Sequence, residues 1–161
     1  MEKDRLRYTI NRFDHYFDSV NNKSAVYIAI NTFITGGVIV ILTQTNIVKD
    51  LTIVGQVTFW ILLLTGIVNL ILLSITSIPF FSSKPKSIYY FGAISKMTQS
   101  EFNKTSKNYS DKEELKDLRS QTFILSYGLT KKFEKLKLAG VLLVLQFFML
   151  LLVFITIITN L

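Results

Sequence analysis

Three long stretches of this chain contain no Lys, Arg, Asp or Glu: residues 24–42, 57–78 and 138–158. Each is about 20 residues long, the length at which a helix crosses a hydrocarbon core of roughly 30 Å. Nearly all the charge lies instead in residues 1–23 and 82–137. Because only helices and closed barrels satisfy their backbone hydrogen bonds in lipid, these blocks predict an all-α membrane protein with three transmembrane helices.

The basic residues predict the orientation of these spans. Of the 18 Lys and Arg residues, only Lys49 lies in the loop 43–56 between the first two spans, and none follows the third span. Cytoplasmic segments of membrane proteins are enriched in Lys and Arg. We therefore expect the N-terminal helix 1–23 and the region 79–137 to be cytoplasmic, with the C-terminus on the outer side.

Composition argues against catalysis. The chain has no cysteine, which excludes disulfides, thiolate metal sites and cysteine nucleophiles. Its single histidine, His15, lies near Asp14 and Asp18 without a nucleophile or a third metal ligand. We therefore expect no enzymatic activity, no catalytic residue, no metal and no cofactor. The net charge of +7 is compatible with an anionic partner, such as a lipid, a nucleic acid or a nucleotide.

Heptad spacing predicts two long helices that enter the membrane. The N-terminal apolar stripe consists of Leu6, Ile10, Phe13, Phe17 and Val20. The second stripe consists of Leu115, Leu118, Thr122, Leu125, Leu129, Lys132 and Leu136. No Pro or Gly interrupts the first helix before Gly36, and no proline follows the capping-box sequence at 110–113. Each helix is therefore expected to continue into its span, the second with roughly 45 to 50 residues.

The two striped helices both run toward the membrane, so we expect them to pack in parallel as a cytosolic helical stalk. The predicted neighbours are Val20 and Lys132, Phe17 and Leu129, and Phe13 and Leu125. The rest of the cytosolic region is predicted to hold a turn at 82–85 and one or two short helices within 86–107. A capping-box sequence at 98–101 marks the start of the second of these helices.

Each predicted span contains one strongly polar residue: Asn31, Asn69 and Gln146. All three lie roughly 9 to 14 Å from the cytoplasmic end of their span, which places them in one layer. Nearby hydroxyls come from Thr32, Thr35 and Thr65. One interpretation is hydrogen bonding between helices, at about 0.6 kcal/mol per bond. The other is a polar lining for a pathway through an oligomer, with Gly36 and Gly37 allowing close helix approach.

A basic collar precedes the third span, made of Lys131, Lys132, Lys135 and Lys137. Snorkelling and topology account for such a collar. Lys132 differs from the others because it falls on the apolar stripe, and Lys23 approaches from the other helix at a similar depth. Two cations at one seam repel each other unless an anion joins them. A phosphate would satisfy both lysines, and Tyr90, Phe91 and Phe102 offer aromatic rings for stacking on a base.

Three blocks of the sequence carry a family resemblance. Residues 21–24 (Asn-Asn-Lys-Ser) are similar to a family Asp-x-Lys-Ala pattern at the entry to the first span. Pro79 and residues 87–94 (Ser-Ile-Tyr-Tyr-Phe-Gly-Ala-Ile), followed by Glu101-Phe102, are similar to an aromatic-Phe-Gly-x-Ile segment that ends in Glu-Phe. Residues 117–121 (Asp-Leu-x-x-Gln) and 132–139 (Lys-Phe-x-x-Leu-x-x-Ala) are similar to a Gln…Lys-Tyr-x-x-Leu-x-x-Ala pattern.

In these blocks the chain resembles the transmembrane effectors of Pycsar anti-phage systems. It departs from the family pattern in three places: Asn21 stands where the family has an acid, Ser24 where it has Ala, and Phe133 where it has Tyr. The family's recurring Lys23, Gln121 and Lys132 coincide with the seam between the two striped helices. The nucleotide-binding residues that the resemblance implies are Asn21, Lys23, Tyr90, Phe91, Gly92, Gln121 and Lys132.

The resemblance implies a receptor that acts on the bacterial inner membrane. A separate cyclase would make cyclic CMP or cyclic UMP during infection, and the cytosolic helices would bind it. The spans would then rearrange or oligomerise and impair the membrane, so that the cell stops growing before phage maturation. The expected partners are membrane lipid, the cyclic pyrimidine nucleotide and further copies of the chain in a homo-oligomer, without nucleic acid.

Two other classes of protein remain open at this point. One is a nucleotide-independent small channel or holin-like protein, and the other is a membrane-anchored helical docking protein. The long cytosolic loop with its aromatic-glycine segment exceeds what a simple holin needs. A docking protein, in turn, would not need a polar layer within its spans.

Overall fold

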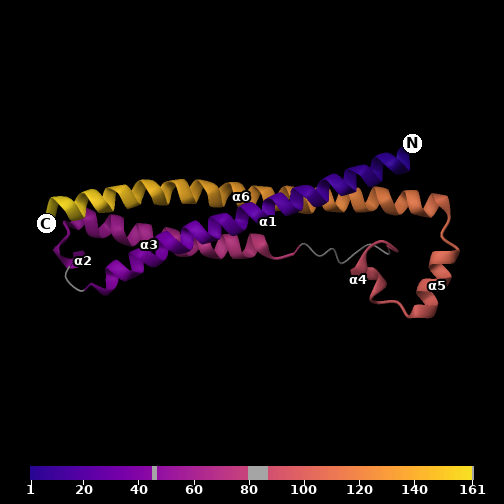
Figure 1. The fold of residues 1–161 in the computed structure, drawn as a ribbon, viewed down its shortest axis with the longest axis horizontal. Coiled ribbons are helices and arrows are strands. Elements are labelled where there is room, and N and C mark those ends of the chain that lie inside the picture. The colour runs from indigo at the N-terminus through magenta and orange to yellow at the C-terminus, as the bar shows by residue number, and fades with distance from the viewer. Residues whose placement is uncertain (45–46, 80–86, 161) are drawn as a thin grey trace. The chain divides into compact units, whose positions relative to one another are not determined.

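The computed structural model describes residues 1–44, 47–79 and 87–160. Within these residues all of the regular secondary structure is helical, with no strand (Figure 1). The helices are α1 (Glu2–Thr43), α2 (Ile47–Asp50), α3 (Ile53–Ser77), α4 (Phe91–Ile94), α5 (Gln99–Lys107) and α6 (Asp111–Asn160). Helices α1, α3 and α6 are each long and apolar enough to cross a membrane. The predicted all-α membrane fold is confirmed, including the long helix that leads into the third span.

The described chain divides into two compact units. The polar unit comprises Met1–Ser19 and Pro79–Lys131, and the membrane unit comprises Val20–Ile78 and Lys132–Leu161. Helices α1 and α6 each contribute their N-terminal part to the polar unit and their C-terminal part to the membrane unit.

In the polar unit, the first turns of α1 and α6 are joined by ion pairs. Lys3 Nζ lies 2.6 Å from Asp111 Oδ1, and Arg7 pairs with Glu114. Arg119 donates two hydrogen bonds of 2.9 Å to the carboxylate of Glu2. In Figure 1 the parts of α1 and α6 that belong to the polar unit run in the same direction, so the two helices are parallel, as expected for the predicted stalk.

Both predicted capping boxes are present. Thr98 Oγ1 accepts from the Glu101 backbone N–H at 3.3 Å, and the Glu101 carboxylate accepts from the Thr98 backbone N–H at 2.8 Å. Ser110 and Glu113 repeat this exchange at the start of α6, with distances of 3.3 and 2.9 Å. Helices α4 and α5 are the short helices expected in the cytosolic region. The turn predicted at 82–85 lies outside the described residues.

The membrane unit packs α3 against the C-terminal parts of α1 and α6 around an apolar core. Its buried members are Ile34, Val38, Phe59, Leu62, Leu63, Leu143 and Val153. Other apolar side chains of the same helices, such as Phe33, Leu64 and Val144, are more than half exposed. Exposed apolar side chains on long apolar helices are what contact with lipid requires.

Helix α3 begins earlier than the apolar run at 57–78. It starts at Ile53, where Thr52 Oγ1 accepts a capping hydrogen bond of 3.2 Å from the Gly55 backbone N–H. The Gln56 side chain also donates to the Leu51 carbonyl at 3.0 Å. These polar caps stabilise a first turn that hydropathy alone assigns to the loop 43–56. The short helix α2 lies in the same loop, of which residues 45–46 are outside the described residues.

The stripe on α1 gives a direct test of the helix pairing in the polar unit. Phe13 is partly buried, whereas Tyr8 on the same helix is 63% exposed. We expect Phe13→Asp to lower the stability of the solubilised protein by about 1–3 kcal/mol, because it forces a charge against the partner helix. Tyr8→Asp is the matched control, with an expected change within about 0.5 kcal/mol. Thermal unfolding followed by circular dichroism measures both, and equal melting temperatures would count against the pairing.

Candidate functional site

The predicted site residue Gln121 belongs to a buried polar network around Asp117 in the polar unit. Ser87 Oγ donates to Asp117 Oδ2 at 2.8 Å, and the Tyr109 hydroxyl donates to the same oxygen at 3.1 Å. Gln121 Nε2 donates to Ser87 Oγ at 2.5 Å. Asp117 is only 6% exposed. The network therefore connects the start of the 87–94 segment to α6 by hydrogen bonds.

Electrostatics keeps Tyr109 as a donor in this network. Burial, followed by the negative charge of Asp117, raises the pKa of the Tyr109 hydroxyl well above its usual range. The hydroxyl therefore stays protonated at physiological pH and continues to donate to the carboxylate. The predicted site residues include Gln121 but not Asp117, which enters the sequence analysis only as part of the family block, although their i, i+4 spacing on a helix places them on one face.

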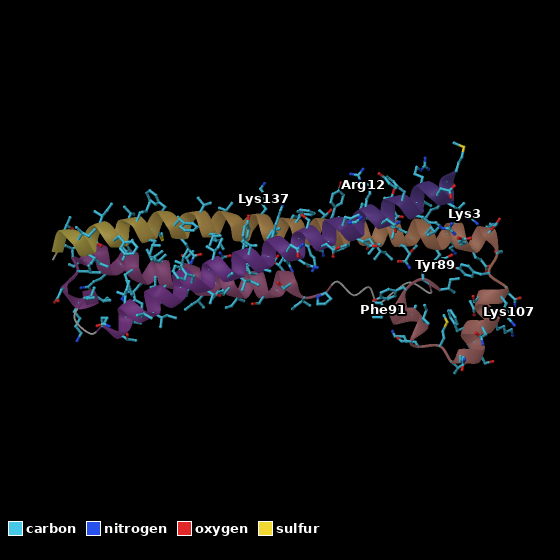
Figure 2. All side chains as sticks on the ribbon, in the orientation of Figure 1. Lys3, Arg12, Tyr89, Phe91, Lys107 and Lys137 are labelled. Carbon is cyan, nitrogen blue, oxygen red and sulfur yellow. The ribbon has the colours of Figure 1, made fainter. Side chains whose placement is uncertain are left out.

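The predicted aromatic residues lie at the start of α4. The rings of Tyr90 and Phe91 have centroids 5.1 Å apart and are tilted by 56°. A Cβ on Gly92 would lie 2.8 Å from an atom of the Tyr90 ring, so glycine is what allows this ring to fold back over α4. Phe91 is 65% exposed and projects from α4 (Figure 2). An exposed ring of this kind offers a face for stacking on a base.

Glu114 is the centre of the ion-pair cluster at the start of α6. Its carboxylate accepts from Lys3 Nζ at 2.8 Å, from Arg7 and from the Tyr89 hydroxyl at 3.1 Å. Lys3 and Tyr89 are labelled in Figure 2. The hydrogen bond from Lys3 is the largest of the effects that lower the pKa of Glu114. The hydrogen bond to Asp111 is the main effect that raises the pKa of Lys3.

The lowered pKa of Glu114 predicts how the polar unit responds to acid. Its carboxylate holds protons less tightly in the folded state than the usual value of 4.5 implies. The stability that it contributes is therefore fully present above pH 4.5 and is lost as the pH falls through the lowered folded-state pKa. Melting temperatures measured between pH 7 and pH 3 should show this loss. Glu114→Gln should reduce it, and an unchanged acid profile in that variant would contradict the assignment.

Lys132, in the membrane unit, is a buried cation with a neutral partner. Its side chain is 7% exposed, and Nζ donates to Asn21 Oδ1 at 3.2 Å. Among the described residues it has no acidic partner. Burial, followed by the charge of Lys135, lowers the pKa of the Lys132 ammonium. An ammonium has three donors, so Lys132 retains donors for an anion.

A buried polar group on α1, the Ser24 hydroxyl, lies one helical turn from Asn21. Ser24 is fully buried, and its hydroxyl has no hydrogen-bond partner among the described residues. An unpaired hydroxyl in such a position costs about 1–3 kcal/mol. Lys23, by contrast, is exposed on α1. The two lysines that the sequence placed at one seam thus have different surroundings, and the charge that acts on Lys132 comes from Lys135.

The three polar residues of the spans meet in the membrane unit. Gln146 Nε2 donates to Asn31 Oδ1 at 2.9 Å, and Asn69 Nδ2 donates to Gln146 Oε1 at 3.3 Å. Asn31 Nδ2 donates to the Gly66 carbonyl at 3.2 Å, and Thr35 Oγ1 donates to Asn31 Oδ1 at 3.0 Å. The three amide side chains are fully buried. The predicted layer therefore ties α1, α3 and α6 to one another inside a single chain.

Sequence reasoning missed the glycine at this layer. A Cβ on Gly66 would lie 2.3 Å from Thr35 Oγ1 and 2.9 Å from Gln146 Nε2, so this position excludes any side chain without rearrangement. A Cβ on Gly36 or Gly37 would have nothing within 4 Å, so these two glycines make no close approach within the chain. The available signal was that Gly66 lies one turn before Asn69 on the same helix.

The seven predicted nucleotide-binding residues belong to both units. Asn21, Lys23 and Lys132 belong to the membrane unit, where Asn21 and Lys132 are hydrogen-bonded. The polar unit contains Tyr90, Phe91, Gly92 and Gln121. Gln121 contacts Ser87 and Asp117, and the Tyr90 and Phe91 rings contact each other beside Gly92. The role of all seven in nucleotide binding stays a prediction.

Comparison with known proteins gives the family. The family model for the Pycsar effector protein domain, PycTM, matches residues 5–159. No curated protein matches the chain, and no solved structure matches it. The family match covers nearly the whole chain and includes the buried Lys132, the Asp117 network and the three spans. The chain therefore belongs to the Pycsar effector family and is an anti-phage effector with a membrane-protein fold.

Proposed function

We propose that this effector binds a cyclic pyrimidine mononucleotide, cyclic CMP or cyclic UMP, and in response impairs the integrity of the bacterial inner membrane. A separate cyclase supplies the nucleotide, and the effector itself makes and breaks no bond. The distribution of Lys and Arg supports a cytoplasmic polar unit and an external C-terminus. Loss of membrane integrity stops growth before phage maturation and thus protects neighbouring cells.

The observation that carries this proposal is the buried Lys132 ammonium held by a neutral amide. A desolvated cation without a counter-ion is costly, and a nucleotide phosphate would offset that cost with charge-assisted hydrogen bonds. Lys132 donates to Asn21, and the Ser24 hydroxyl, one turn along α1, is an additional donor without a partner among the described residues. The Lys132 ammonium and the Ser24 hydroxyl can both donate a hydrogen bond to a phosphate oxygen.

In this proposal, no separate structural element is needed to carry the effect of nucleotide binding from Lys132 to the spans. Asn21 and Lys132 lie on α1 and α6, the same two helices that carry Asn31 and Gln146. A ligand that changes how α1 packs on α6 at Lys132 therefore acts on the helix pair that holds the polar layer together. The ligand shifts this equilibrium only by its difference in affinity for the two arrangements. The active arrangement is proposed to be a homo-oligomer in the membrane.

A binding titration tests the proposal. Cyclic CMP and cyclic UMP are titrated by calorimetry into the detergent-solubilised full chain, with cyclic AMP, cyclic GMP and linear 5′-CMP as controls. Saturable binding of one or both cyclic pyrimidines, tighter than that of the controls, is the expected result. Absence of binding by either cyclic pyrimidine would refute nucleotide sensing, and equal binding of the purines would refute the proposed pyrimidine specificity.

A further inference from the structure

A groove runs between α1 and α6 within the membrane unit. Its volume is about 500 Å³, and its lining is mainly apolar with two lysines. Lys23 and Lys137 are its charged members, and its other lining residues are Tyr27, Phe133, Leu136, Gly140, Val141 and Val144. Because the two helices run parallel, Lys23 precedes Tyr27 on α1 and Lys137 precedes Gly140, Val141 and Val144 on α6, whereas Phe133 and Leu136 line the groove before Lys137. The groove therefore combines two positive charges with an apolar surface that continues past them to Val144.

Gly140 shapes this groove. A Cβ at this position would lie 3.3 Å from the Tyr27 ring, which is tighter than an ordinary van der Waals contact. The missing side chain lets the Tyr27 ring lie close to the α6 backbone. A tyrosine whose ring rests on an apolar wall suits the boundary between headgroups and acyl chains, where one end of the side chain is wet and the other is dry.

The charge at the mouth of the groove has no counter-ion within the described residues. Neither Lys23 nor Lys137 takes part in an ion pair there, and Lys137 projects outward from α6 (Figure 2). Lys132 and Lys135 add positive charge on the same helix, and Glu134 is the single acid on that stretch of α6. This end of the membrane unit is thus complementary to an anion.

We propose that the groove binds an anionic phospholipid, with the headgroup phosphate at Lys23 and Lys137 and an acyl chain along Gly140, Val141 and Val144. The apolar part of the groove favours a lipid over a nucleotide as its occupant. Valine side chains offer no hydrogen bond to a ribose or a base, whereas they match an acyl chain. This lipid site is separate from the Asn21–Lys132 pair and does not depend on nucleotide binding.

Native mass spectrometry of the full chain in detergent tests this proposal. Phosphatidylglycerol and phosphatidylcholine with the same acyl chains are added in equal amounts. We expect phosphatidylglycerol to be retained preferentially, and Lys137→Gln to weaken its binding about fivefold. Lys135→Gln is the matched control, because it removes the same charge from the same helix outside the groove lining, and it should leave binding within about twofold.

A third variant tests the acyl-chain part. Gly140→Leu fills the groove without changing its charge and should abolish retention of phosphatidylglycerol. If this variant fails to fold, a competition experiment with inorganic phosphate on the wild type takes its place. We expect inorganic phosphate not to displace phosphatidylglycerol from the wild type. Equal retention of the two lipids, equal weakening by Lys137→Gln and Lys135→Gln, or displacement by inorganic phosphate would each overturn the proposal.

Discussion

The Lys132→Met variant is expected to fold and insert like the wild type but to lose its response to the nucleotide. Methionine keeps most of the apolar stem and removes a buried charge whose partner is the neutral Asn21 side chain. Replacing a buried, poorly compensated ion by an apolar group of similar volume is often neutral or stabilising. Thermal stability without nucleotide should therefore stay equal or rise.

The loss of response should be large. A hydrogen bond to a charged group contributes about 1.5–3 kcal/mol, so nucleotide affinity should fall roughly 10- to 150-fold in Lys132→Met. Lys131→Met is the matched control, because Lys131 is exposed and rests over the Tyr127 ring. Calorimetric titration of both variants measures the difference. A Lys132→Met protein that binds and responds like the wild type would remove Lys132 from the mechanism.

The lowered pKa of Lys132 adds a pH dependence to this prediction. Burial makes the ammonium lose its proton at a pH below the usual 10.5. A bound phosphate favours the charged form, so nucleotide affinity should fall as the pH rises through the lowered pKa. Lys132→Arg keeps its charge throughout this range, and any affinity it retains should vary less with pH. The same pH profile in both proteins would contradict this assignment.

Gly66→Ala is the second substitution with a large expected effect. The added Cβ would fall 2.3 Å from Thr35 Oγ1 and 2.9 Å from Gln146 Nε2, so the polar layer must rearrange to admit it. Overpacking of this kind costs about 1–3 kcal/mol. Displacing the Gln146 amide also weakens its hydrogen bonds to Asn31 and Asn69, at about 0.6 kcal/mol each.

Gly36→Ala is the control for this experiment. It adds the same methyl group to a span at a position with nothing within 4 Å, so it should cost no stability. The chain's single tryptophan, Trp60, lies on α3 together with Gly66 and reports unfolding by its fluorescence. Equal stability of Gly66→Ala and the wild type would show that the layer tolerates a side chain there.

Periodicity and charge were enough to predict most of the fold. The charge-free runs predicted the three spans, and the heptad stripes predicted the parallel course of α1 and α6. Both capping boxes were predicted from four-residue sequences because a cap depends only on local contacts. The meeting of Asn31, Asn69 and Gln146 followed from their equal depth, since residues at one depth on packed helices lie within reach of one another.

The remaining details depend on how far apart the helices lie and how each is rotated, which periodicity does not determine. Gly36 and Gly66 are both glycines within a span, yet only the backbone of Gly66 faces the side chains of Thr35 and Gln146. The hydrogen-bonded burial of Asp117 depends on Ser87 and Tyr109, which come from outside its helix and which helical periodicity does not place beside it. Lys23 and Lys132 lie at similar depth, but only Lys132 is buried.

Leakage of a trapped dye from proteoliposomes tests the central claim most directly. The full chain is reconstituted in vesicles of phosphatidylethanolamine and phosphatidylglycerol, and cyclic CMP, cyclic UMP or cyclic AMP is added to the side that the polar unit faces. We predict rapid leakage with at least one cyclic pyrimidine and only background leakage with cyclic AMP or without nucleotide. Leakage that is the same with and without cyclic pyrimidines, or that is absent in every condition, would contradict nucleotide-gated membrane disruption.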